Sequence, residues 1–142
     1  MTLARDHIKP NNEGGAGRIM SNKIVVLLTD GQPNLYTSSA STISSYISQH
    51  PSANFYGSSS NYSQDAALMQ TTMMQGNHWY LYSAGVGLGC DYGFMDRMAR
   101  LGATANSQGE SFRGSGDPAV YETKMQEIFE KIITNPKLRL VQ

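Results

Sequence analysis

The clearest pattern along the chain is an unbroken apolar row, Ile-Val-Val-Leu-Leu, within residues 23–33, KIVVLLTDGQP. The row lacks alternation of apolar and polar residues, which is typical of a parallel-sheet strand covered by helices on both faces. It is too short for a helix and is followed by Asp30, Gly31 and Pro33. We therefore predict a buried strand over residues 23–29 that places Asp30 at the carboxyl edge of a sheet.

The same reasoning predicts a second strand over residues 79–86, WYLYSAGV, and a short third strand over residues 111–113. Apolar residues at helical spacing predict helices over residues 41–49, 64–75, 92–101 and 118–134. Residues 1–7 are expected to form the last turn of another helix. Strands and helices that alternate in this order predict an α/β fold, a partial doubly wound and mostly parallel sheet flanked by helices.

The predicted helices have expected ends and expected buried faces. Ser63 and Asp91 are the expected N-caps, Asp117 before a proline is expected to start the last helix, and Gly76 and Gly102 are the expected terminators. The expected buried face is Ala66, Met69 and Met73 in helix 64–75, and Phe94, Met95 and Met98 in helix 92–101. In helix 118–134 it is Tyr121, Met125, Ile128 and Ile132, widened by Phe129 and Ile133.

The pattern predicts three regions. Residues 1–22 are a polar leader with the end of a preceding helix and a loop, residues 23–134 are the folded part, and residues 135–142 are a tail. Residues 35–62 form a Ser-, Tyr- and Asn-rich insertion, and its loop over residues 51–61 is longer than a plain connection requires. This loop is either a functional recognition segment or a disordered surface loop.

Charge and composition exclude several functions. The chain has 11 Lys and Arg residues and 11 Asp and Glu residues, and this zero net charge argues against nucleic-acid binding and against a polybasic membrane surface. Because it has no long apolar run and no signal peptide, any membrane contact is expected to involve regions outside this chain. Cys90 is the only cysteine, so no internal disulfide can form.

Asp30 is the candidate binding residue that the pattern indicates. It ends an apolar strand, and Gly31 is expected to allow close approach of the backbone. A carboxylate in this place can bind a hard divalent cation, with Thr29 hydrogen-bonded beside it. In the alternative interpretation, Asp30 caps a turn and Gly31 satisfies its geometry.

Catalytic signatures are weak elsewhere. Residues 85–89, GVGLG, lack the third glycine of a dinucleotide-binding loop, because Cys90 stands in its place. There is no P-loop and no G-x-S-x-G motif, and the three histidines are not at metal-binding spacing. The remaining enzymatic alternative is a hydrolase or transferase that uses Cys90 or Asp30. We expect, however, that the protein is not an enzyme.

Four segments, in order, resemble the von Willebrand factor A-type (VWA) domain family. Residues 23–34, KIVVLLTDGQPN, resemble its T-D-G strand, and residues 79–87, WYLYSAGVG, resemble the next strand. Residues 94–104, FMDRMARLGAT, with residues 109–118, GESFRGSGDP, resemble the following helix and short strand, and residues 120–133, VYETKMQEIFEKII, resemble the closing helix. Within the family, the closest likeness is to bacterial TadG-like tight-adherence proteins of pilus assembly.

The resemblance implies a non-enzymatic protein-binding or adhesion module at the cell envelope or outside the cell. The family's metal-ion-dependent adhesion site combines a D-x-S-x-S loop, a threonine from a second loop and the aspartate of T-D-G. Only the last of these maps onto this chain, at Asp30. The resemblance therefore implies weak or absent binding of Mg²⁺, Mn²⁺ or Ca²⁺, and a protein partner that presents an acidic group to this edge.

The missing motif has a structural consequence. No aspartate of the chain begins D-x-S-x-S, and family members have further strands before the T-D-G strand. The chain is therefore expected to be the C-terminal part of such a domain, with the first strands missing and with self-association through the exposed edge of strand 23–29. The alternative function is an intracellular VWA domain that joins subunits of an ATPase or chelatase assembly.

Overall fold

The fold is described from a computed structural model, which places residues 1–87, 89–113 and 118–134. Every predicted strand and helix is present in the predicted order, within two residues of its expected bounds. The elements are α1 (Thr2–Ile8), η1 (Asn11–Glu13), β1 (Ile24–Thr29), α2 (Ala40–Gln49), η2 (Ser59–Asn61), α3 (Tyr62–Gly76), β2 (Tyr80–Gly85), α4 (Tyr92–Leu101), β3 (Phe112–Arg113) and α5 (Pro118–Thr134).

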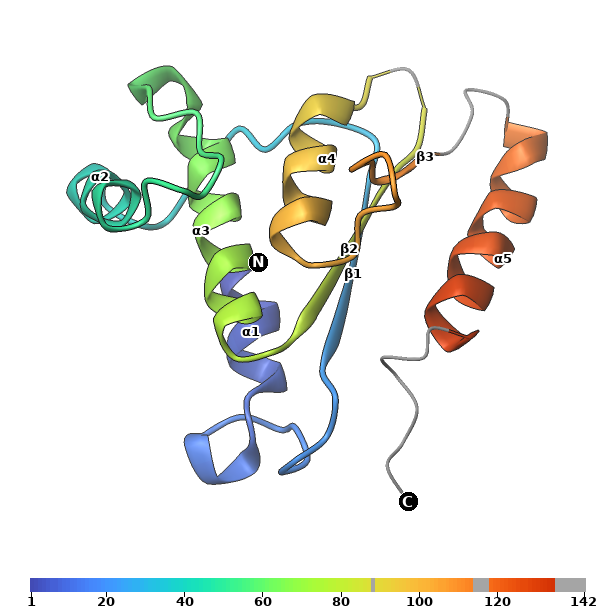
Figure 1. Cartoon of the computed structure of the whole chain (residues 1–142), viewed down its shortest axis with the longest axis horizontal. Helices are drawn as coiled ribbons and strands as arrows, with labels where there is room; N and C mark the ends of the chain where they lie inside the picture. Colours follow the sequence, from blue (N-terminus) through green and yellow to red (C-terminus); the bar gives the residue numbers. More distant parts are fainter. Residues whose placement is uncertain (88, 114–117, 135–142) are drawn as a thin grey trace.

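The strands of the described residues form one parallel sheet in the order β1-β2-β3. Ile24 lies opposite Tyr80, Thr29 lies opposite Gly85, and Gly85 lies opposite Arg113. Because all three strands run in the same direction, their carboxyl ends meet at one edge, at the upper end of the sheet in Figure 1. This confirms the predicted α/β fold with a parallel sheet flanked by helices.

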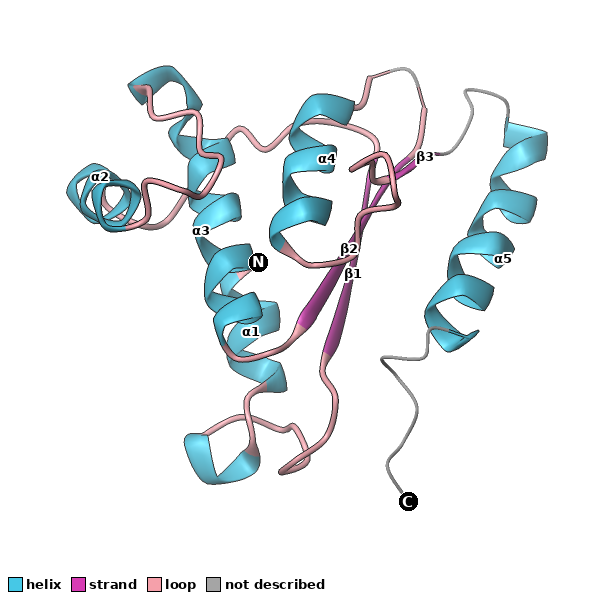
Figure 2. Ribbon diagram, in the orientation of Figure 1, coloured by secondary structure: helices cyan, strands magenta, loops and turns pink. Residues whose placement is uncertain are grey.

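The main core lies between the sheet and the two helices α3 and α4, which cover one face (Figure 2). The predicted apolar face of α4 is confirmed, since Phe94, Met95 and Met98 are all buried. In α3, the predicted Met69 is buried, whereas Met73 is only partly buried. Leu81 of β2 completes this core, which is lined largely by methionine and leucine side chains.

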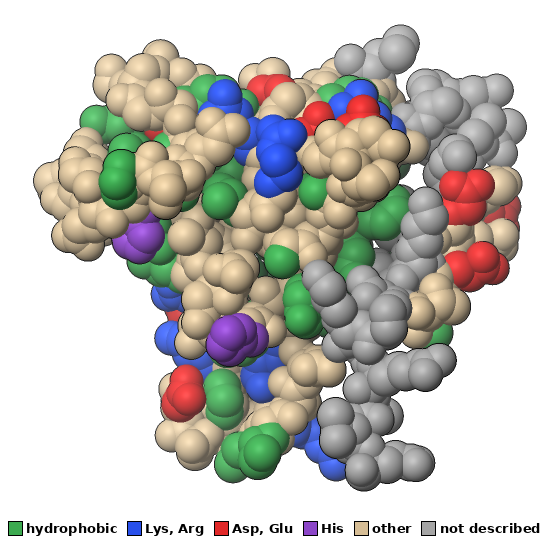
Figure 3. All heavy atoms as spheres, in the orientation of Figure 1, with side chains coloured by type: hydrophobic (Ala, Val, Ile, Leu, Met, Phe, Trp, Pro, Cys, Tyr) green, Lys and Arg blue, Asp and Glu red, His purple; other side chains and the backbone are tan. Residues whose placement is uncertain are grey.

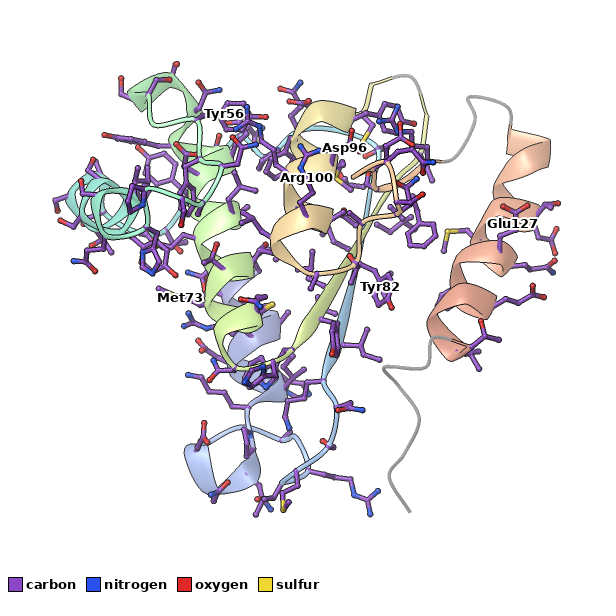
Figure 4. The ribbon with its side chains drawn as sticks, viewed as in Figure 1. Tyr56, Met73, Tyr82, Asp96, Arg100 and Glu127 are labelled. Carbon is purple, nitrogen blue, oxygen red and sulfur yellow. The ribbon has the colours of Figure 1, made fainter. Side chains whose placement is uncertain are left out.

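The opposite face of the sheet is covered only in part, by α5 (Figure 1). Met125 of α5 packs against Tyr82 of β2, which points toward α5 in Figure 4. On the same face, Val26 and Leu28 of β1 remain 36% and 48% exposed. The prediction of a strand was correct, but the prediction of a fully buried strand was wrong, because β1 is the edge strand and α5 packs on β2.

The remaining part of α5 also differs from the prediction. Phe129 is 49% exposed and Ile133 is 77% exposed, so neither widens a buried stripe. Residue Asp117, the side chains of Tyr121, Ile128 and Ile132, and the tail 135–142 lie outside the described residues. Within the part that the structure describes, no helix is both long and apolar enough to cross a membrane.

The predicted helix ends agree with the structure only for α4. The Asp91 carboxylate accepts a hydrogen bond from the Phe94 N–H at 3.0 Å, and Gly102 is the C-cap. The prediction for α3 was wrong at both ends, because Asn61 and Asn77 are its caps. Ser63 lies inside the first turn, where its hydroxyl bonds to a neighbouring side chain, and Gly76 is the last helical residue.

Candidate binding edge around Asp30

Asp30 lies at the carboxyl end of β1, as predicted, and its side chain is exposed. The turn after the strand is closed by Thr29, whose hydroxyl oxygen accepts a hydrogen bond from the Gly31 N–H at 3.2 Å. No hydrogen bond or ion pair of the Asp30 carboxylate is found among residues 1–87, 89–113 and 118–134. Among the described residues, the turn is therefore closed by Thr29 and not by the Asp30 carboxylate.

The expected role of Gly31 is wrong, because a Cβ added there would meet no atom within 4 Å. The close approach is instead made by Gly89, where an added Cβ would lie 3.1 Å from the Asp30 carbonyl oxygen. The loop after β2 thus packs against the main chain of Asp30. Gly87 has a φ of +86°, which favours glycine, and its carbonyl accepts a hydrogen bond from the Tyr92 hydroxyl at 3.0 Å. The described glycines of this segment, Gly87 and Gly89, thus have the positive φ and the close main-chain approach that favour glycine in a turn.

The described residues include no group of three or more His, Cys, Asp and Glu side chains that could hold a metal ion. Asp91, also at this edge, uses one carboxylate oxygen to cap α4. Thr29 bonds to Gly31 rather than to the Asp30 carboxylate. The side chains described at this edge do not by themselves form a cation site, since a hard divalent cation takes six or more oxygen ligands.

A long uncharged segment follows Asp30 directly. Residues 31–64 contain no Asp, Glu, Lys or Arg and are rich in Ser, Tyr and Asn. They form α2, η2 and the loops around them. In Figure 3 the surface over α2 and the upper end of α3 is mostly uncharged, whereas charged side chains gather over α1, α4 and α5. Asp30 is thus followed in the chain by a neutral, hydroxyl-rich segment.

The loop over residues 51–61 is held in place by α3 and α4. Asp65 of α3 is fully buried, and its two carboxylate oxygens accept hydrogen bonds from the N–H groups of Tyr56 and Gly57 at 2.8 and 2.9 Å. Arg97 of α4 donates to the Asn54 carbonyl at 2.7 Å, and its guanidinium lies 4.1 Å from the centre of the Tyr56 ring. Figure 4 shows Tyr56 near the upper ends of these two helices. These contacts join the loop to both helices at Asn54, Tyr56 and Gly57.

Aromatic side chains attach α2 to the same framework. The Tyr46 ring meets the Phe55 ring edge-on at 6.1 Å, and it also stacks on the ring of His50, the C-cap of α2, with centroids 4.0 Å apart. The hydroxyl groups of Ser44 and Tyr62 are 2.7 Å apart and hydrogen-bonded. These contacts leave the outer face of α2 free, where mostly hydroxyl and amide side chains line a shallow hollow of about 370 Å³.

Cys90 lies beneath this edge, buried beside Gly85, where an added Cβ would lie 2.5 Å from its sulfur atom. Burial raises the pKa of the Cys90 thiol, and the carboxylates of Asp91 and Asp30 raise it further. The thiolate is the nucleophilic form, so its fraction at neutral pH is small. This environment is opposite to that of an activated catalytic cysteine.

We expect Cys90 to react with iodoacetamide at pH 8 at least about tenfold more slowly than an exposed thiol. The matched control is Ser52→Cys in a Cys90→Ala background, because Ser52 is exposed.

The raised pKa of the Cys90 thiol in the folded chain also means that the unfolded chain loses the thiol proton first, at about pH 8.5. The stability that Cys90 contributes is therefore present below that pH and lost as the pH rises toward the folded pKa. Alkylation of Cys90 at the rate of the Ser52→Cys control would contradict the prediction of a slow reaction.

Comparison of the chain with protein-family models, with curated proteins and with solved structures finds no match. The likeness to VWA domains therefore rests on the sequence segments named above. The structure places Asp30, the site residue that the sequence indicated, at the same edge as Asp91, which the sequence indicated only as a helix cap. It adds two that sequence reasoning missed, Asp65 and Arg97, whose partners are distant in the chain.

Proposed function

We propose that this chain is a non-enzymatic protein-binding module of the VWA type, resembling those of cell-envelope or extracellular TadG-like pilus-assembly proteins. The observation that carries the proposal is the Asp30 carboxylate, exposed at the carboxyl edge of a parallel sheet and without a bond among the described residues. Open α/β sheets bind their ligands at this edge, because loops from successive strands converge there. No catalytic pair of side chains is needed for such a role.

The neutral segment that follows Asp30 in the chain supports a protein partner. Tyr, Ser, Gly and Asn are the residues that predominate in antibody binding loops, where tyrosine gives contact area at low entropic cost and the small polar residues adapt their hydrogen bonds. Residues 31–64 are rich in the same residue types. Because Asp65 and Arg97 already fix the loop, binding would cost less conformational entropy than it would for a free loop.

We propose that the partner presents an acidic group to this edge of the sheet. A divalent cation at Asp30, such as Mg²⁺, would place positive charge beside it, with the remaining ligands supplied by water and by the partner. Since the described residues include no cluster of metal-binding side chains, the cation alone is expected to bind weakly, with a dissociation constant of about 1 mM or higher.

Mn²⁺ is the probe that tests this proposal. Added at millimolar concentration, it is expected to broaden the amide NMR signals of residues 29–31 and 89–91 selectively, because Gly89 packs against the Asp30 main chain and Cys90 is close enough to interact with the Asp30 carboxylate. Asp30→Asn keeps the shape of the side chain but removes its charge, and it should abolish the broadening.

The matched control for the Mn²⁺ experiment is Glu13→Gln, which neutralises an exposed carboxylate in the N-terminal loop. This variant should keep the broadening around Asp30. Broadening that is spread evenly over the exposed carboxylates, or that survives in Asp30→Asn, would contradict the proposal.

A further inference from the structure

A methionine of α3 is in direct contact with a charged side chain of α1. The Arg5 guanidinium donates a hydrogen bond from Nη1 to the Met73 sulfur atom at 2.7 Å. Figure 4 shows Met73 on α3, the helix against which α1 packs. A thioether sulfur is a weak acceptor, so a strong, charged donor is here paired with a poor partner. An oxygen atom added to this sulfur would supply a much better acceptor in the same place.

The Arg5 guanidinium has few acceptors among the described residues. Its Nη2 donates to the Asp6 carboxylate at 3.2 Å, and this carboxylate also pairs with Lys9. Its Nε is buried and has no hydrogen-bond partner within the described part of the chain. A guanidinium carries five N–H donors, so the charge of Arg5 is incompletely paired. A stronger acceptor at Met73 would therefore attach α1 more firmly to α3.

Met73 also differs from the methionines of the core in its exposure. It is only partly buried. The methionines of α3 and α4 that are at most 2% exposed are Met69, Met74, Met95 and Met98. A thioether sulfur has two lone pairs, and Arg5 binds one of them, which leaves the other for reaction. A small oxidant in solvent thus has a shorter route to Met73 than to the core sulfur atoms.

We propose that Met73 is an oxidation site, at which a peroxide forms a methionine sulfoxide that Arg5 then binds. The free sulfur lone pair attacks one oxygen of hydrogen peroxide, the S–O bond forms, the O–O bond breaks, and the second oxygen leaves as water. The sulfur loses two electrons and the peroxide gains them. The sulfoxide oxygen is one covalent bond from the sulfur, where the long Arg5 side chain can donate a charge-assisted hydrogen bond to it.

This oxidation differs from the usual one in its effect on the fold. Methionine sulfoxide in a core disrupts apolar packing, because a polar group is buried without a partner. At Met73 the partner is already in place, so oxidation is expected to tighten the contact between α1 and α3. Neither Arg5 nor Met73 belongs to the Asp30 edge or to residues 31–64, and the inference does not depend on the proposed function.

The order of oxidation in hydrogen peroxide is the first measurement, followed by NMR of the methionine methyl groups in the full chain. Met20 is 98% exposed and serves as the fast reference. Met69 and Met74 are buried on the same helix as Met73 and are the matched controls. Met73 is expected to react more slowly than Met20 but at least about tenfold faster than the two controls. Oxidation of Met73 at the rate of Met69 and Met74 would overturn the proposal.

The second measurement is the Tm once Met73 has reacted and the core methionines have not. The unchanged chain should gain about 3 °C, because a hydrogen bond to a charged group replaces a weak contact to sulfur. Met73→Leu keeps every other methionine and should show no gain. Arg5→Ala should turn the gain into a loss, because the sulfoxide then lacks its donor. If Arg5→Ala does not fold, the comparison with Met73→Leu still decides. A lower Tm in the oxidised unchanged chain, or an equal change in Met73→Leu, would overturn the proposal.

Discussion

Replacing Asp65 with alanine is expected to lower the free energy of unfolding by about 3 kcal/mol and to release the loop 51–61 from α3. Asp65 is fully buried, and its carboxylate accepts the N–H groups of Tyr56 and Gly57 at 2.8 and 2.9 Å. A buried carboxylate is tolerated only when it is hydrogen-bonded, and its removal leaves two backbone donors without a partner. Denaturant unfolding followed by circular dichroism measures the loss of stability.

The same variant separates a local effect from a global one. Hydrogen exchange at the amides of Tyr56 and Gly57 should accelerate far more than exchange in β2, because these amides lose their acceptors directly. Asp96→Ala is the matched control. The Asp96 carboxylate also accepts a backbone hydrogen bond, from the Ser111 N–H at 2.8 Å, but it attaches β3 to α4. A loop that exchanges as slowly in Asp65→Ala as in the unchanged chain would show that other contacts hold it.

The features that the sequence predicted well are those with local causes. The bounds of α4, its cap at Asp91 and its end at Gly102 all depend on residues within one or two turns of each other. The placement of Asp30 also followed locally, because an apolar strand fixes where its last residue emerges and a parallel sheet fixes which edge that is.

The features that the sequence could not predict depend on contacts between distant residues. Asp65 falls within the predicted helix over residues 64–75, but its burial arises from backbone groups in a loop that folds back over it. Arg97 and Asn54 are 43 positions apart, and neither residue carries a signal of the pairing. For Val26 and Leu28, an apolar row indicates a strand, but it does not show whether a helix covers each face.

The exposed edge of β1 leads to the second large expected effect, self-association of the chain through this strand. The carbonyl groups of Lys23 and Thr29 accept hydrogen bonds from the segment that contains β2. Alternate residues of a strand direct their main-chain groups to opposite sides, so Ile24, Val26 and Leu28 direct theirs to the free edge. No other strand pairs with this edge within the described residues, and unpaired strand edges with apolar side chains are templates for pairing.

A second copy of the chain fits this edge when the two β1 strands run antiparallel and cross at Val26. Ile24 of each copy then lies opposite Leu28 of the other, and the exposed apolar side chains of both copies form one continuous row on the face that α5 leaves open. Sedimentation should therefore show a dimer whose fraction rises with concentration. The double variant Val26→Lys, Leu28→Lys should weaken the association at least about tenfold, since it places like charges across the new pair of strands.

Leu35→Lys is the control that separates strand pairing from general surface hydrophobicity. Leu35 is 85% exposed, more than Val26 or Leu28, but it belongs to the segment after β1 and not to the strand. If strand pairing drives the association, Leu35→Lys leaves the dimer intact while the lysines at positions 26 and 28 disperse it. If Leu35→Lys disperses the dimer instead, the two copies meet at the surface around Leu35 and not at β1. A monomer at all concentrations with a cooperative melt at high temperature would show that β1 tolerates its open edge, and that Val26 and Leu28 are too few to drive pairing.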